Sequence, residues 1–160
     1  MALRWSYRSK HKIMKRLSII AVLALTLFTT AFANKTTSPG FKGMEHFIKS
    51  FPEATGVVYK AVEKFTEVNF TWHDMRLQAF YDEDGDLFAT SRHLAVNDLP
   101  LSSQLKIKKE FPGYITTEAI EFDATDMGLS YYVTIVGPKR SYVLKVSTDG
   151  MIDVFKKMKN

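Results

Sequence analysis

The chain of 160 residues contains no cysteine. It can therefore form no disulfide, it has no thiolate nucleophile, and it lacks the residue to which a bacterial lipoprotein anchor is attached. Nucleotide-type glycine loops and the G-x-S-x-G nucleophile elbow are also missing from its 8 glycines. A folded domain of this sequence must be held together by apolar packing alone.

The part of the chain that follows residue 33 has no excess of positive charge. The net charge of +5 includes six basic residues before that point, and the remainder has 16 basic and 17 acidic residues. A domain with a net charge near −1 has no overall positive charge to attract the phosphate backbone of a nucleic acid. Nucleic-acid binding is therefore not expected.

Residues 15–33 have the pattern of a secretory signal peptide. Lys15 and Arg16 precede an apolar run over 17–28, which ends at the small-x-small sequence Ala31-Phe32-Ala33. The alternative is a transmembrane anchor, but a span needs about 20 apolar residues. We expect cleavage after Ala33 on the general secretory route, no stable membrane insertion afterwards, and a periplasmic or secreted protein. The position of Met14 suggests that translation starts there, so that residues 1–13 are not part of the natural protein.

After a polar, turn-rich leader over 34–40, the pattern changes to alternating helix and strand signals. Apolar residues at Met44, Phe47, Ile48 and Phe51 mark one face of a helix that Pro52 ends. A second helix is predicted over 101–111, before Pro112-Gly113. Period-two alternation with recurring turn residues predicts antiparallel strands at 57–62, 65–71, 76–82, 86–92, 114–122, 129–136, 141–147 and 151–157.

The two halves of residues 41–160 show a weak internal repeat. Lys49-Ser50-Phe51-Pro52 aligns with 109–112, and the strand end and Asp-Gly turn at 81–85 align with 146–150. Chance matching is the alternative. The predicted fold is α+β: two helix-plus-four-strand units, 41–96 and 97–160, form one domain with an antiparallel sheet and helices on one face.

None of the candidate chemical motifs fits a catalytic or metal site. The acidic run 82–86 has its glycine at the fourth position, not the sixth that an EF-hand requires, so a hairpin turn explains it. Glu118 with Glu121, or Asp123 with Asp126, could form a carboxylate pair for glycoside hydrolysis, but paired carboxylates on strands are usually solvated. We predict no enzyme activity, no cofactor and no metal.

Strand alternation assigns an apolar core and an opposite, partner-binding face. The core set is Leu77, Ala79, Tyr81, Leu87, Ala89, Tyr131, Val133, Ile135, Tyr142, Leu144, Val146, Ile152 and Val154. Aromatic and basic residues on a sheet face without helices are typical of protein-recognition surfaces, although cross-strand packing is the alternative. The predicted partner-binding residues are Arg76, Phe80, Phe88, Arg92, Tyr132, Lys145 and Phe155, together with Trp72 at a hairpin tip.

The order of several short segments carries a family resemblance: Phe51-Pro52, 79–92, Leu99-Pro100, 118–121, 131–133 and Asp149-Gly150. This order resembles the PepSY-like, beta-lactamase-inhibitor-like (BLIP-like) exported proteins of Bacteroidetes, with the departure that Tyr59 stands where such proteins often have tryptophan. The resemblance implies two helix-plus-four-strand units, an open sheet that can hold a partner protein, and no catalytic residues.

The leading functional hypothesis is an exported, non-enzymatic module that binds or inhibits another envelope protein through an exposed sheet face. The alternative is a periplasmic carrier or sensor of a small ligand, which would need an enclosed cavity. A hydrolase that uses scattered carboxylates is the least favoured hypothesis.

Overall fold

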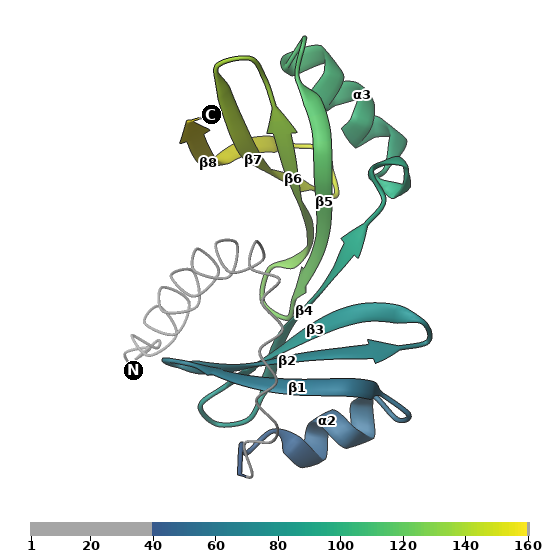
Figure 1. The fold of residues 1–160 in the computed structure, drawn as a ribbon, viewed down its shortest axis with the longest axis vertical. Helices are drawn as coiled ribbons and strands as arrows, with labels where there is room; N and C mark the ends of the chain where they lie inside the picture. Colours follow the sequence, from purple (N-terminus) through teal and green to yellow (C-terminus); the bar gives the residue numbers. More distant parts are fainter. Residues whose placement is uncertain (1–39, 160) are drawn as a thin grey trace, which may run out of the picture. The chain divides into compact units, whose positions relative to one another are not determined.

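The computed structural model describes residues 40–159, so the predicted signal peptide, the start at Met14 and most of the leader lie outside the described residues. The elements follow in the order shown in Figure 1. They are α2 (Met44–Ser50), β1 (Thr55–Val62), β2 (Phe65–Trp72), β3 (Met75–Asp82), β4 (Leu87–Leu94), the 3₁₀ turn η1 (Val96–Asp98), α3 (Leu101–Glu110), β5 (Ile115–Ala124), β6 (Gly128–Val136), β7 (Arg140–Ser147) and β8 (Ile152–Lys159). The predicted α+β class is confirmed, and the predicted strand ends differ by a few residues.

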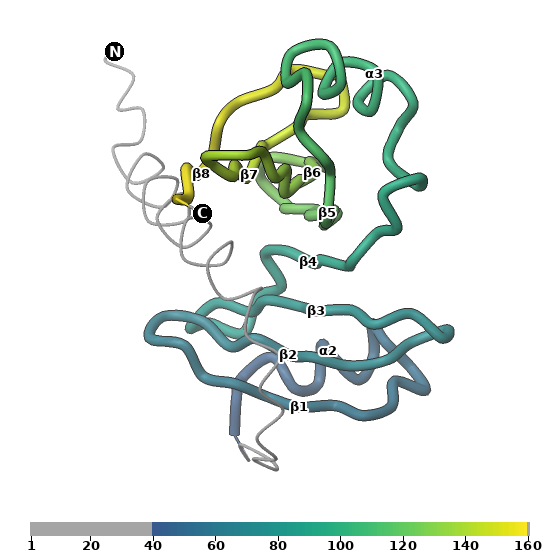
Figure 2. The backbone as a smooth tube through the Cα atoms, turned by 45° about the horizontal axis from the view of Figure 1, so that its top comes forward, coloured from purple at the N-terminus to yellow at the C-terminus, as the bar shows by residue number. Residues whose placement is uncertain are grey.

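The strands form one antiparallel sheet in which each strand pairs with the next along the chain, from β1 to β8. Figure 2 shows β4 leading through η1 into α3, which lies between the two sets of four strands in the sequence. Short turns join the strands within each set of four. Gly85 N–H donates to the Asp82 carbonyl at 3.0 Å and Gly150 N–H to the Ser147 carbonyl at 2.9 Å, so both predicted Asp-Gly turns are confirmed.

Both helices pack on the same face of the sheet, which we call the helix-bearing face. Phe47 of α2 is buried against a cluster that includes Phe70 and Ala79, and Ile107 of α3 against a cluster that includes Val133. Cross-strand partners share a face, and the register links Phe70, Leu77, Arg92, Glu121 and Tyr131 in one row. We call the other side, which neither α2 nor α3 covers, the opposite face.

The predicted apolar stripe of α2 is wrong at one position. Ile48 is 62% exposed, whereas Phe47 is 2% exposed and its ring packs edge-on against Phe70 at 4.9 Å. A helix of seven residues contacts the sheet along a narrow line, so the residue next to Phe47 turns outward.

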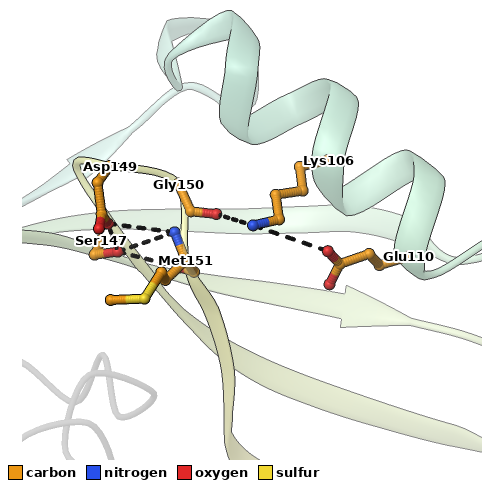
Figure 3. Close-up of polar contacts among 6 residues, drawn as sticks. All are labelled: Lys106, Glu110, Ser147, Asp149, Gly150 and Met151. Carbon is orange, nitrogen blue, oxygen red and sulfur yellow. Dashed lines mark hydrogen bonds and ion pairs between the residues drawn. The ribbon is translucent and has the colours of Figure 1, made fainter.

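A polar clamp joins α3 to the turn between β7 and β8 (Figure 3). Lys106 Nζ donates to the Gly150 carbonyl at 2.7 Å and lies 4.0 Å from Glu110 Oε1, one turn further along the helix. Within the turn, Ser147 Oγ donates to Asp149 Oδ1, and Met151 N–H donates to Ser147 Oγ at 3.0 Å. The helix therefore fixes the hairpin by a hydrogen bond to its backbone, in addition to apolar packing.

We expect Asp149→Asn to lower the thermal unfolding midpoint at neutral pH and to matter less in acid. The hydrogen bond from Ser147 holds the pKa of Asp149 below its ordinary value of 3.8. A lowered pKa in the folded state contributes stability above the ordinary value, and this contribution is lost as the pH falls through the folded-state pKa. Thermal melts between about pH 6 and pH 2 should show the two proteins converging, with Asp153→Asn, at an exposed position on β8, as the comparison variant.

Candidate functional site

The aromatic residues predicted to form an exposed platform are buried on the opposite face. Phe80, Phe88 and Tyr132 are 1%, 6% and 5% exposed. Ring contacts run across the sheet in one row: Phe65–Phe80 and Phe65–Phe88 at 6.2 and 6.1 Å, Phe80–Phe88 at 6.2 Å, Phe80–Phe122 at 6.1 Å, Phe122–Tyr132 at 5.9 Å and Tyr132–Phe155 at 5.1 Å. The expected exposure of these rings is wrong, because each ring covers its neighbours.

We call these six residues, Phe65, Phe80, Phe88, Phe122, Tyr132 and Phe155, the aromatic row. Burial raises the pKa of Tyr132 to about 12, so its hydroxyl stays protonated under ordinary conditions. Lys145, the cross-strand partner of Tyr132, and Phe155 at the end of the row are both half-buried. Arg76 is exposed on β3, where its cross-strand partner is Thr71.

A β-bulge explains why the predicted faces of β4 fail. Leu87 pairs with Tyr81, but Ala89 pairs with Phe80, so Phe88 is an extra residue in the strand. Because of this extra residue, each later residue of β4 lies on the face opposite to the one that period-two alternation predicts. Ala89, predicted as core, therefore lies on the opposite face, whereas Arg92, predicted on the opposite face, lies on the helix-bearing face.

The structure brings Trp72 and Arg92 together in a groove on the helix-bearing face. The groove has a volume of about 210 Å³, and its lining is Phe51, Phe70, Trp72, Met75, Leu77, Thr90, Ser91, Arg92, Glu121 and Asp123. Phe51, which directly follows the last residue of α2, belongs to this lining together with residues of β2, β3, β4 and β5. The groove therefore lies beside the C-terminal end of α2.

An ion pair crosses the floor of the groove. Arg92 Nε donates to Glu121 Oε1 at 2.6 Å, and Arg92 Nη2 donates to Glu121 Oε2 at 3.2 Å, in a bidentate fork. The hydrogen bond that Arg92 donates to Glu121 is the main cause that raises the pKa of Arg92 above its ordinary value. The Arg92 side chain remains 36% exposed, and its Nη1 also reaches Met75 Sδ at 3.5 Å. The guanidinium plane is thus fixed but accessible.

Trp72 forms one wall and is held by the two residues that follow α2, Phe51 and Pro52. Its Nε1–H donates to the Pro52 carbonyl at 2.8 Å, and its ring packs edge-on against Phe51 at 5.6 Å. The adjacent turn residues His73 and Asp74 both have positive φ, 49° and 61°, which is the geometry of a tight hairpin turn. The expectation that Trp72 sits beside a hairpin tip is confirmed, but the side chain is half-buried and docked rather than free.

The structure separates one of the two carboxylate pairs considered for hydrolysis. Glu118 pairs across the sheet with Thr134 on the opposite face, whereas Glu121 pairs with Tyr131 on the helix-bearing face. Asp123 lies on β5 and Asp126 in the turn that follows it. Among residues 40–159, no three His, Asp or Glu side chains gather as metal ligands. No described helix has the length and apolar character needed to cross a membrane.

Most of the groove has no signal in the sequence. Met75 and Leu77 lie on β3 and Thr90 on β4, and for Glu121 the sequence suggests only a carboxylate pair with Glu118. The bulge at Phe88, which brings Thr90 and Arg92 to this face, has no glycine or proline to mark it.

Solved structures of low sequence identity share this fold. They include a BLIP-like protein from Bacteroides fragilis (TM-score 0.68, 15% identity, 78% of this chain and 90% of that chain) and a DUF2874 family protein from Bacteroides uniformis (TM-score 0.67, 12% identity, 75% and 88%). A third, described as a candidate periplasmic protein, is from Bacteroides eggerthii (TM-score 0.65, 10% identity, 79% and 90%). No family model and no curated protein matches the sequence. The expected BLIP-like resemblance is confirmed as a likeness of fold, and the PepSY resemblance stays a prediction.

Proposed function

We propose that this chain is an exported, non-enzymatic module that binds another protein of the cell envelope through the groove on its helix-bearing face. The observation that carries the proposal is that Trp72 and Arg92, the two residue types most often responsible for binding energy at protein interfaces, meet in one groove. The signal-peptide pattern of residues 15–33 and the BLIP-like fold of the solved neighbours favour the same class of protein.

The size and lining of the groove favour a protein partner over a small ligand. Its volume of about 210 Å³ is below the range of about 300–1,000 Å³ that is usual for small-molecule pockets. A side chain or a short turn of a partner protein would fit. The rigid indole of Trp72 and the fixed guanidinium of Arg92 would be desolvated with little loss of side-chain freedom, because both are already held in place.

We also infer that the two helix-plus-four-strand segments are diverged copies of one unit. Phe51 and Phe111 end their helices with nearly the same backbone angles, φ −126°, ψ 65° and φ −123°, ψ 64°. Each N–H donates to the residue four positions earlier, at 2.9 and 2.8 Å, and a Pro follows each. In this interpretation the two copies join where β4, the last strand of the first copy, pairs with β5, the first strand of the second copy. The groove includes residues of both strands, so it lies at the junction of the copies.

Site-specific photo-cross-linking in living cells tests the binding proposal. A photoreactive residue at Met75, which lines the groove and is 38% exposed, should trap a discrete envelope protein. The same residue at Ile115, 70% exposed and outside the groove, is the matched control. Thr90→Arg, which would fill the groove from its floor, should abolish the Met75 product. The cross-linked product should be found in the periplasmic fraction. In that product, the chain described here should begin at Asn34.

Three outcomes would contradict the proposal. Equal products from Met75 and Ile115 would mean that the groove is not the binding surface. A Met75 product that persists in Thr90→Arg, with the folded structure retained, would mean the same. Recovery of this protein from the cytosol with residues 15–33 still attached would contradict export.

A further inference from the structure

A buried carboxylate lies on the opposite face, apart from the groove. Glu67 on β2 is only 5% exposed. Its Oε1 accepts hydrogen bonds from Asn69 Nδ2 at 2.8 Å and from Gln78 Nε2 at 3.1 Å. Gln78 Nε2 also donates to Asn69 Oδ1 at 2.8 Å, and Ser91 Oγ donates to Gln78 Oε1 at 2.9 Å. A network across β2, β3 and β4 therefore fixes the orientation of this carboxylate.

The second oxygen of the same carboxylate has no hydrogen-bond partner. Glu67 Oε2 is buried and accepts no hydrogen bond, and the nearest cation is Lys60 Nζ at 4.0 Å. That distance is at the limit of an ion pair, and the Lys60 side chain is 52% exposed on the edge strand β1. A buried carboxylate oxygen without a donor is costly, so a site of this kind is stabilised when a cation reaches it.

The surroundings of Glu67 suit a cation. Phe80 is its cross-strand partner on β3, and Phe65 precedes it by two residues on the same face of β2. These rings belong to the aromatic row and exclude water from one side of the carboxylate, which strengthens its attraction for a positive charge. Oε1 is already saturated by two amide donors, so only Oε2 is free. A single free oxygen matches the point charge of an ammonium better than the two-pronged guanidinium.

We propose that Glu67 is a binding site for a primary ammonium group, such as the side chain of a lysine on a partner protein. In the free protein, the Lys60 ammonium lies 4.0 Å from Oε2 and forms only a weak ion pair with it. The ammonium of the ligand displaces the Lys60 side chain and donates a hydrogen bond to Oε2. Asn69, Gln78 and Ser91 are positioning residues, because they hold the carboxylate and do not contact the ligand. Glu67 does not line the groove, so this site stands or falls independently of the function proposed above.

Titration of the intact protein with blocked lysine, Nα-acetyl-lysine methylamide, tests the proposal by nuclear magnetic resonance. The side-chain amide signals of Asn69 and Gln78 report directly on the Glu67 carboxylate, and they should shift in a saturable manner. Blocked arginine is the second arm, and the Nε-acetylated lysine analogue, which has no charge, is the control. The lysine probe should bind most tightly, arginine more weakly, and the neutral analogue should cause no shift.

Two variants separate binding from folding. Glu67→Gln removes the charge at nearly constant shape and should weaken the lysine probe by about tenfold or more. Lys60→Met removes the internal competitor from an exposed edge position and should tighten binding by about twofold to fivefold. Unchanged affinity in Lys60→Met, equal shifts with the neutral analogue, or tighter binding of arginine than of lysine would each overturn the proposal, even if Glu67→Gln failed to fold.

Discussion

Phe80→Ala is expected to destabilise the fold by about 3–5 kcal/mol, as other deletions of fully buried aromatic side chains do. Phe80 is 1% exposed and lies at the centre of the aromatic row, where its ring contacts Phe65, Phe88 and Phe122. Truncation would leave a cavity that three neighbouring strands cannot close without breaking their hydrogen-bond register. The free energy of unfolding, from urea denaturation followed by circular dichroism, measures this effect.

Phe155→Ala is the matched control for this prediction. Phe155 ends the same row on the edge strand β8, is half-buried, and contacts one ring of the row, that of Tyr132. Its truncation should cost clearly less than that of Phe80, because the edge can relax and water can fill the space. If Phe80→Ala kept full stability and lost only a binding partner, the row would be an exposed platform after all, and the burial described above would be incorrect for the free protein.

The positions of the strands could be predicted from the sequence because local signals mark them. Period-two alternation interrupted by Asp84-Gly85 and Asp149-Gly150 marks strand ends and hairpins. Phe51-Pro52 and Phe111-Pro112 mark the helix ends in the same way. These features depend on neighbouring residues only, so no tertiary information was needed to place them. The pairing of β4 with β5 has no such local signal, because η1 and α3 separate these two strands in the sequence.

The face of each residue could not be predicted in full, because β-bulges shift it. Alternation alone places Phe88 and Arg92 on one side, but the extra residue at Phe88 moves Arg92 to the other. A similar irregularity in the pairing of Val143 and Leu144 with β8 leaves Phe155 as the extra residue there. Bulges of this type respond to sheet twist and cross-strand packing, which a single strand does not encode.

The same limit applies to exposure. The number of aromatic residues on one sheet face predicts an exposed protein-binding surface. However, aromatic rings on adjacent strands lie close enough to bury one another. The sequence therefore identified Phe80, Phe88 and Tyr132 as neighbours on one side of the sheet but assigned them the wrong environment. Glu67 escapes prediction for a related reason. A lone glutamate in an alternating strand is typical of a solvated face, whereas in the structure Glu67 is 5% exposed and accepts hydrogen bonds from Asn69 and Gln78.

Phe47→Ala is expected to have an effect of similar size, about 3–5 kcal/mol, because Phe47 is the buried anchor of α2. Its ring packs against Phe70 at 4.9 Å, Phe51 at 5.4 Å and Tyr59 at 6.0 Å. A helix of seven residues has little stability of its own, so loss of this anchor should release α2 from the sheet.

The two buried clusters make the location of this effect informative. The cluster around Phe47 involves the first strands, and the cluster around Ile107 involves β5, β6 and β7, with no residue shared between them. Native-state hydrogen exchange should therefore show protection falling further in β1 to β3 than in β6 to β8 for Phe47→Ala, and the reverse for Ile107→Ala. A uniform loss in both variants would mean that the hydrogen bonds between β4 and β5 couple the halves into one cooperative unit. In that case the two clusters, although separate in their contacts, would act as a single core.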